Sequence, residues 1–226
     1  MYAFAQRSDT RVIDEPLYGH YLRVSNAPHP GREAVIVSME SDVARVISDV
    51  ILGPCDRPVL FMKQMAHHLV EIDHSFMQHT ANVLLIRDPV EMLPSLAGVL
   101  ETPRLQDTGF AAQYALLQEL RNLGQNPPII DAKELLLNPA SVLKQLCQRL
   151  GIAFEPAMLC WEPGPRPEDG VWAKYWYGNV HRSNGFQPYA PKTAPFPDRL
   201  KPLLQECMPY YNALSDLAIK ADGEPV

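Results

Sequence analysis

An unbroken hydrophobic run at residues 83–86 (Val-Leu-Leu-Ile) gives the clearest element of this chain. Such a run predicts a strand that is buried on both faces of a parallel sheet. Arg87 and Asp88 end the run, and Pro89 follows at a position where proline can open a helix, because its missing N–H costs nothing there. The segment therefore predicts a strand, a charged turn and a helix. In open α/β sheets, ligands bind at turns of this kind.

The rest of the pattern alternates short apolar runs with stretches of helical periodicity. Runs at 11–14, 59–62 and 128–131 predict strands, and residues 25–40 read as an irregular loop. Helices are predicted at 17–24, from 41 to about 52, 89–99, 108–123, 139–150 and from 202 or 207 to 218. Strands that alternate with helices indicate an α/β fold built from parallel βαβ units. After Gly151 the periodicity fades, and residues 160–198 are expected to form a long loop or lid.

Composition narrows the class of protein. A chain of 226 residues, 46% hydrophobic and 20% charged, fits a single globular domain over residues 1–226. The net charge of −6 disfavours nucleic acid and anionic membrane surfaces as partners. No apolar run reaches the roughly 18 residues of a transmembrane helix, and no signal peptide is recognisable. The four scattered cysteines, with Cys147 on an apolar helix stripe, indicate a reducing, cytoplasmic setting.

The spacing from Arg87 to Ser95 suggests an anion site. A guanidinium offers a planar fork of donors that matches phosphate oxygens, and a hydroxyl eight residues later, inside the predicted helix, can add one more bond. The alternative is a surface turn in which Arg87 pairs with Asp88 and Ser95 is solvated. The residues alone leave both interpretations open.

Arg-Asp-Pro followed by Ser95 resembles the 3′-phosphate-binding motif of sulfotransferases that use 3′-phosphoadenylyl sulfate. The likeness covers nearly the whole chain, and it extends to residues 12–18 (VIDEPLY), 61–69 (FMKQMAHHL) and 169–177 (DGVWAKYWY). It implies a three-layer α/β/α, P-loop nucleotide-hydrolase-like fold with a mostly parallel sheet. It also implies that Arg87 and Ser95 hold the 3′-phosphate and that the acceptor is a small molecule. The identity of the acceptor and the oligomeric state remain open.

The resemblance suggests two candidates for the base that takes the acceptor's proton. Glu15 follows the strand at 11–14, as a catalytic glutamate does in several sulfotransferases; the alternative is that it caps the helix at 17–24. His67 and His68 lie four and five residues after Lys63, whereas cytosolic members of the family place the catalytic histidine two residues after the lysine. No third ligand accompanies the histidine pair, so a metal site is not expected.

A third group lies in the late loop, at Arg182 and Gly185. In the family, a loop with Arg, Gly and an aromatic folds over the adenosine bisphosphate. Arg182 would then meet a phosphate, and Gly185 would let the backbone approach the ligand. The alternative is a proline-rich surface loop anchored by its tryptophans.

One family feature, the P-loop, is absent from the sequence. Residues 1–226 contain no Gly-rich loop between a strand and a helix, and in the family this loop and the central first strand precede a stretch like residues 1–7. The chain is therefore expected to be either an N-terminally truncated sulfotransferase or a degenerate domain that acts in binding or as a scaffold. Enzymatic activity is left open. A kinase-like phosphotransferase is disfavoured, because no Walker lysine and no acidic Mg²⁺ cluster are present.

Overall fold

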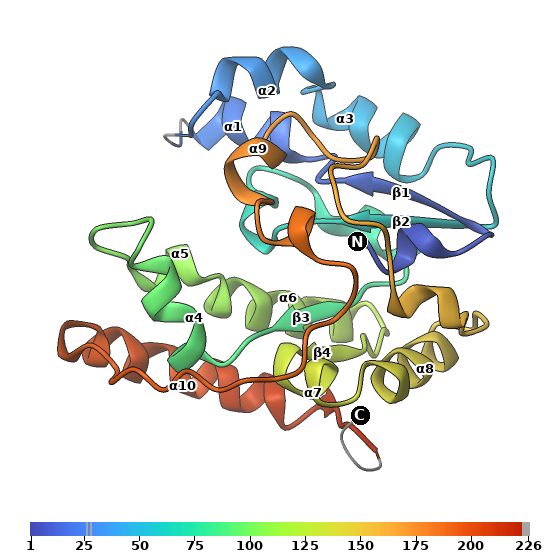
Figure 1. Cartoon of the computed structure of the whole chain (residues 1–226). Helices are drawn as coiled ribbons and strands as arrows, with labels where there is room; N and C mark the ends of the chain where they lie inside the picture. The colour runs from blue at the N-terminus through green and yellow to red at the C-terminus, as the bar shows by residue number, and fades with distance from the viewer. Residues whose placement is uncertain (26, 28, 223–226) are drawn as a thin grey trace. The chain divides into compact units, whose positions relative to one another are not determined.

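The protein is described by a computed structural model that covers residues 1–25, 27 and 29–222. These residues fall into two compact units (Figure 1). Unit 1 comprises Met1–His79 and Glu155–Phe186, and unit 2 comprises Thr80–Phe154 and Gln187–Val226. A single domain over residues 1–226 stays a prediction.

Unit 1 is built around two parallel strands, β1 (Thr10–Asp14) and β2 (Val59–Lys63). Their register pairs Asp14 with Lys63, so both strands end side by side at their carboxyl ends. The remaining elements are α1 (Tyr18–Ser25), α2 (Arg32–Ser38), α3 (Val43–Arg45), the π-helix η2 (Val46–Ile51), α9 (Ala173–Trp176) and the 3₁₀ helices Phe4–Gln6, Ala66–His68, His74–His79, Pro156–Leu159 and Val180–Arg182.

The core beside α1 and α2 joins distant parts of the chain. Leu22 of α1 and Val35 of α2 are fully buried and pack with Trp172, which directly precedes α9. The later part of unit 1, Glu155–Phe186, is called the late segment below. It packs into this core through Trp172. The prediction of an irregular loop at 25–40 was wrong for α2, although residues 26 and 28 lie outside the described residues. Proline and glycine precede this helix, and Val35 gives it a buried face.

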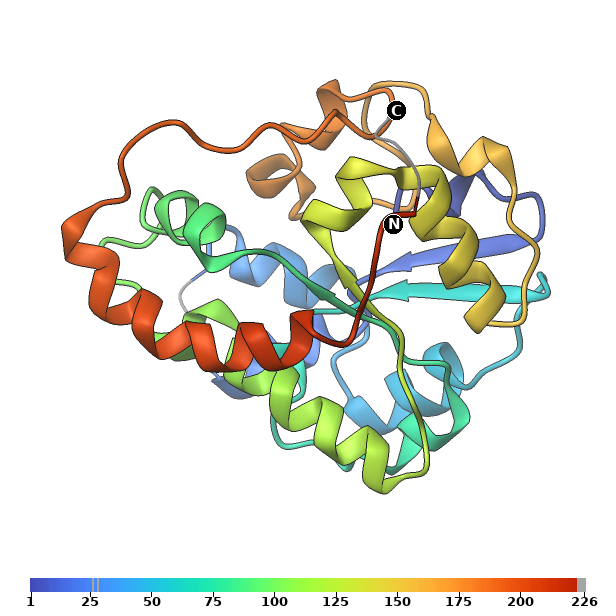
Figure 2. The same cartoon turned by 90° about the horizontal axis from the view of Figure 1, so that it is seen from below.

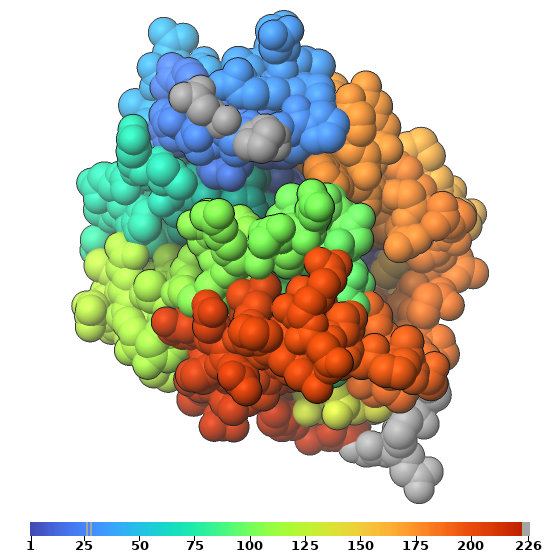
Figure 3. Space-filling model, turned by 90° about the vertical axis from the view of Figure 1, so that its left-hand side faces the viewer, coloured from blue at the N-terminus to red at the C-terminus, as the bar shows by residue number. Residues whose placement is uncertain are grey.

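Unit 2 holds three parallel strands in the order β3 (Leu84–Ile86), β4 (Ile129–Asp131) and β5 (Ala218–Ile219). Its helices are α4 (Pro89–Leu96), α5 (Leu105–Thr108), α6 (Phe110–Asn122), α7 (Ala132–Leu137), α8 (Pro139–Arg149) and α10 (Lys201–Ser215), with a 3₁₀ helix at Asp198–Leu200. Leu84 and Ile86 pack with Leu117 of α6 and Leu214 of α10. Figure 2 shows α6 and α10 (light green and red) side by side next to the strands, and Figure 3 shows α10 lying against α4 and α5.

The predicted α/β class with a mostly parallel sheet is confirmed, because every pairing between the named strands is parallel. The predicted strand, turn and helix after residue 83 are also confirmed, but burial of the strand on both faces was wrong, because Leu85 is 56% exposed. Asp88 caps α4 by accepting a hydrogen bond from the Val90 N–H at 2.8 Å, and Pro89 occupies the first turn. Cys147 is fully buried in α8, as predicted. The predicted loop at 160–198 is mostly irregular, and its role as a lid stays a prediction.

Candidate functional site

The carboxyl ends of β1 and β2 bring Asp14, Glu15 and Lys63 together in unit 1. The Glu15 N–H donates to the Lys63 carbonyl oxygen at 2.8 Å, which continues the strand pairing by one residue. Glu15 then turns the chain sharply, with a φ of 45°, a conformation that few residues other than glycine adopt. This backbone places both carboxylates at the strand ends, beside the lysine.

Glu15 forms an ion pair with Lys63 in a largely buried setting. The Glu15 side chain is 7% exposed, whereas the Lys63 side chain is 29% exposed. Burial raises the pKa of Glu15 above its ordinary value, and the neighbouring Lys63 ammonium partly offsets that rise. Burial therefore increases the proton affinity of the Glu15 carboxyl, and the Lys63 ammonium limits that increase.

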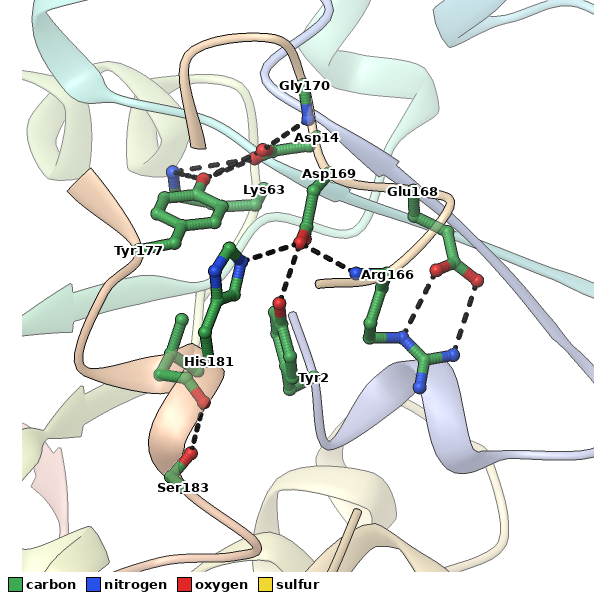
Figure 4. Close-up of polar contacts among 11 residues, drawn as sticks. Tyr2, Asp14, Lys63, Arg166, Glu168, Asp169, Gly170, Tyr177, His181 and Ser183 are labelled. Atoms are coloured by element: carbon green, nitrogen blue, oxygen red, sulfur yellow. Dashed lines mark hydrogen bonds and ion pairs between the residues drawn. The ribbon is translucent and has the colours of Figure 1, made fainter. Parts of the chain in front are cut away.

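Tyr177 ties the late segment of unit 1 to this pair of strand ends (Figure 4). Its hydroxyl accepts a hydrogen bond from Lys63 Nζ at 2.7 Å and donates to the Asp14 carboxylate at 2.8 and 2.9 Å. Burial, with the Asp14 and Glu15 carboxylates nearby, raises the pKa of Tyr177, so the hydroxyl stays protonated and able to donate.

Asp169 contributes a buried carboxylate from the late segment (Figure 4). Its Oδ2 accepts hydrogen bonds from the Tyr2 hydroxyl at 2.8 Å and from the backbone N–H of Arg166 at 2.9 Å. His181 Nε2 lies 2.9 Å from the same oxygen. The Asp169 side chain is 4% exposed and that of His181 is 22% exposed. The network fixes the late segment against the start of the chain, and no sequence pattern indicated it.

The two candidate histidines have different surroundings. His68 is buried and its ring is stacked between Tyr18 and Tyr21, with a ring-centre distance of 4.6 Å to each. Its Nδ1 lies 3.8 Å from Glu15 Oε2. Burial lowers the pKa of His68 to about 2, so the imidazole is neutral. His67 is only partly buried and meets Tyr21 edge-on at 5.3 Å.

Arg182 and Gly185 lie at the end of the late segment of unit 1. The Arg182 guanidinium is exposed and donates to Asn179 Oδ1 at 2.6 Å. Gly185 forms an isolated antiparallel bridge with Cys160, and a Cβ at this position would lie 2.8 Å from the Leu159 carbonyl oxygen. Packing against Leu159 is thus one reason for the glycine. The ligand contacts expected of both residues stay predictions.

In unit 2, Arg87 lies in the turn between β3 and α4, two residues before the helix begins, whereas Glu91 and Ser95 lie one turn apart on the same face of α4. The Arg87 guanidinium lies 3.8 Å from the Glu91 carboxylate, and half of the Arg87 side chain is exposed. Ser95 Oγ accepts a hydrogen bond from Lys192 Nζ at 2.8 Å. Both side chains can therefore be reached from solvent with hydrogen-bonding groups available.

The structure thus gathers the predicted residues into groups. Glu15 and His68 meet beside Lys63; Arg87 lies in the turn before α4 and Ser95 in that helix; Arg182 and Gly185 belong to the late segment of unit 1. Sequence reasoning missed Asp14, Tyr177 and Lys192 as partners of these groups. Only Asp14 carried a local signal, because it stands at a predicted strand end.

Within residues 1–25, 27 and 29–222, no three His, Cys, Asp or Glu side chains are arranged so that they could hold a metal ion. Among the helices of the same residues, none combines the length and the apolar character that a bilayer crossing requires.

Parallel strands that alternate with helices define an α/β protein, and in open sheets of this class ligands bind beyond the carboxyl ends of the strands, where Arg87 lies. The chain belongs to the sulfotransferase-domain family, whose family model matches residues 1–218.

Two relatives from Arabidopsis thaliana are much longer than this chain. Branched-chain-amino-acid aminotransferase-like protein 2 is 36% identical over 215 residues, and protein 1 is 38% identical over 217 residues. Each alignment covers 95% of this chain but only 38% and 39% of the respective relative. Among solved structures, the sulfotransferase domain from the curacin biosynthetic pathway is similar, with a TM-score of 0.43, 18% identity, and coverage of 85% of this chain and 78% of that one.

Proposed function

We propose that this chain binds 3′-phosphoadenylyl sulfate and transfers its sulfuryl group to a small-molecule acceptor. The observation that carries the proposal is an exposed Arg87 in the turn between β3 and α4, followed by an exposed Ser95 in α4, in a chain of the sulfotransferase-domain family. A guanidinium and a hydroxyl suit a phosphate, because both donate hydrogen bonds to its oxygens. The donor, once bound, supplies an activated sulfuryl group with a phosphate as its leaving group.

In this proposal, Arg87 and Ser95 bind the 3′-phosphate and orient the nucleotide. Arg182, exposed at the end of the late segment, would bind a phosphate of the donor with its guanidinium. Gly185 would let the backbone there approach the ligand.

Glu15 is the proposed base for the acceptor's proton. Its raised pKa lies closer to the working pH than that of an ordinary carboxyl, which improves proton transfer. Lys63 would fix the carboxylate, and His68 is less suited because its neutral ring is stacked and buried. His67, only partly buried, is the alternative base.

A thermal-shift titration with adenosine 3′,5′-bisphosphate, compared with adenosine 5′-monophosphate, tests the donor site. A ligand that binds only the folded state adds about 2.7 kcal/mol at a hundredfold excess over its dissociation constant. We expect stabilisation by the bisphosphate alone, and its loss in Arg87→Ala and Ser95→Ala. Arg121→Ala, which removes an exposed arginine from the end of α6, is the matched control.

The outcomes separate the candidate functions. Equal responses to both nucleotides, or an Arg87→Ala variant that binds normally, would overturn the 3′-phosphate site. Binding without release of bisphosphate, across a panel of phenols, alcohols and amines, would instead favour the degenerate binding domain. A requirement for Mg²⁺ in nucleotide binding would favour a kinase-like phosphotransferase.

A further inference from the structure

Residues 187–197, which lead into the helices at the C-terminal end of unit 2, contact the face of α4 that carries Glu91 and Ser95; Figure 1 shows them as the orange-red coil before α10. Two contacts tie this segment to α4. The Tyr189 hydroxyl donates to Glu91 Oε1 at 2.7 Å, and Lys192 Nζ donates to Ser95 Oγ at 2.8 Å. The three-residue spacing of the segment thus spans one turn of the helix, from Glu91 to Ser95. This places the Lys192 ammonium in direct contact with Ser95.

The Lys192 ammonium donates to Ser95 and forms no ion pair with a carboxylate among the described residues. The nearby acids already have other partners. Glu91 accepts from Tyr189 and lies 3.8 Å from Arg87, and Asp88 accepts from the Val90 N–H. Each of these contacts lies within unit 2.

A second lysine contributes charge at the same edge. Lys133, in the first turn of α7 after β4, places its ammonium 5.6 Å from the centre of the Tyr189 ring. Asp131, next to it in sequence, accepts from the Lys133 N–H at 2.8 Å and from the Tyr211 hydroxyl at 2.7 Å. The Lys133 ammonium, like that of Lys192, forms no ion pair in the described part of the chain. Lys133 beside the Tyr189 ring and Lys192 on Ser95 are two such cations, and they favour an anion at this edge.

The direction of the Lys192–Ser95 hydrogen bond matters for ligand binding. Lysine can only donate, so the serine oxygen accepts and its own O–H remains available to donate elsewhere. The ammonium has three N–H groups, of which this contact uses one. A phosphate beside Ser95 could therefore receive a hydrogen bond from the hydroxyl and another from the ammonium, without breaking their contact.

We propose that Lys192 is a third residue of the 3′-phosphate site and selects ligands that carry a 3′-phosphate. This inference rests on the proposed function, because Arg87 and Ser95 define the site. Tyr189 positions the lysine by holding its segment on Glu91.

Titration calorimetry with adenosine 3′,5′-bisphosphate and adenosine 5′-monophosphate tests the inference. Lys192→Met should weaken bisphosphate binding about tenfold, as expected for loss of a charge-assisted hydrogen bond at a partly exposed site. It should leave 5′-monophosphate binding unchanged. Lys144→Met, which removes an exposed lysine from α8, should bind both nucleotides as the wild type does.

Two further variants sharpen the result. Lys192→Arg keeps the charge and should retain most of the affinity. The double variant Lys192→Met/Ser95→Ala should lose less binding free energy than the two single variants lose together, because the residues are in contact and act on one phosphate. The difference between wild type and Lys192→Met should also shrink at high salt, because the charge is exposed.

The possible failures are distinguishable. If Arg87→Ala abolishes selectivity for the bisphosphate while Lys192→Met binds like Lys144→Met, the role of Lys192 is overturned and the proposed function stands. If the wild type shows no preference for the bisphosphate, both are overturned.

Discussion

The Tyr177 hydroxyl lies 2.8 Å from Asp14 Oδ2, although the two residues are 163 positions apart in the chain. The Asp14 side chain is 1% exposed, so its carboxylate depends on protein donors for the hydrogen bonds that water would otherwise supply. Tyr177 is its closest donor, and the Gly170 N–H follows at 3.4 Å. This contact therefore holds the late segment to the strand ends where Glu15 and Lys63 meet.

Tyr177→Phe should destabilise the protein by about 1.5–3 kcal/mol, because it removes a hydrogen bond to a buried charge. Urea unfolding measures the loss, and hydrogen exchange should show faster exchange in residues 170–181. Tyr175→Phe is the control, since Tyr175 is 41% exposed, and it should change stability by less than about 0.5 kcal/mol. Equal stability of the two variants would mean that the Asp14 contact contributes nothing.

The Glu15–Lys63 pair should show unequal effects when each partner is removed. Lys63→Met leaves a nearly buried carboxylate without its cation, whereas Glu15→Gln leaves a lysine that reaches solvent. The first variant should lose about 3 kcal/mol and the second less, because uncompensated buried charge is the larger cost. The double variant should lose less than the sum.

Chemical denaturation at neutral pH measures these losses. Asp56→Asn serves as the control, since Asp56 forms an ion pair with Arg11 in which both side chains are more than half exposed. It should change stability by less than about 1 kcal/mol. Additive losses in the Glu15→Gln/Lys63→Met double variant would contradict a coupled pair.

Local patterns in the sequence were sufficient for the segment that holds Arg87 and Ser95. The apolar run, the capping Asp88 and Pro89 are all signals of neighbouring residues, and the helical spacing places Glu91 and Ser95 on one face of α4. These features depend on backbone geometry that repeats every few residues. They could therefore be predicted without knowledge of the rest of the chain.

Contacts between distant residues could not be predicted in this way. Tyr177 reaches Asp14, and Asp169 accepts from Tyr2 across 167 positions, yet no periodic pattern links them. Lys192 was missed for the same reason, since its segment is irregular and its partner lies on a helix almost a hundred residues earlier. Short elements such as β5, with two residues, carry too few positions for a pattern.

Gly185→Ala should be destabilising because the space for a Cβ is already filled. The added carbon would lie 2.8 Å from the Leu159 carbonyl oxygen, so the backbone bridge with Cys160 must shift. We expect a loss of about 1–3 kcal/mol in thermal or urea unfolding.

Gly178→Ala is the matched control in the same segment. There the nearest atom to a new Cβ is a nitrogen of the flexible Arg182 side chain at 3.6 Å, an ordinary contact. This variant should stay within about 0.5 kcal/mol of the wild type. If both variants unfolded alike, close packing at Gly185 would not be the reason for a glycine there.

Acid should destabilise the protein through His68. In the folded state, burial between Tyr18 and Tyr21 lowers the pKa of this imidazole to about 2, whereas an unfolded histidine has a pKa of about 6.5. Below pH 6.5 the unfolded state therefore binds a proton that the folded state does not. Stability from this group is present above pH 6.5 and falls by about 2 kcal/mol between pH 7 and pH 5. Glu15, whose pKa is raised, acts in the opposite sense above pH 4.5.

His68→Phe isolates the effect, because phenylalanine keeps a ring between the two tyrosines and removes the titrating group. Urea unfolding of both proteins at pH 8, 7, 6 and 5 should show a smaller acid-induced loss in the variant, with the difference growing below pH 6.5. His79→Gln, a change at an exposed histidine, should follow the wild type. Parallel curves for wild type and His68→Phe would mean that His68 takes up a proton in the folded state, and the neutral, stacked imidazole would be wrong.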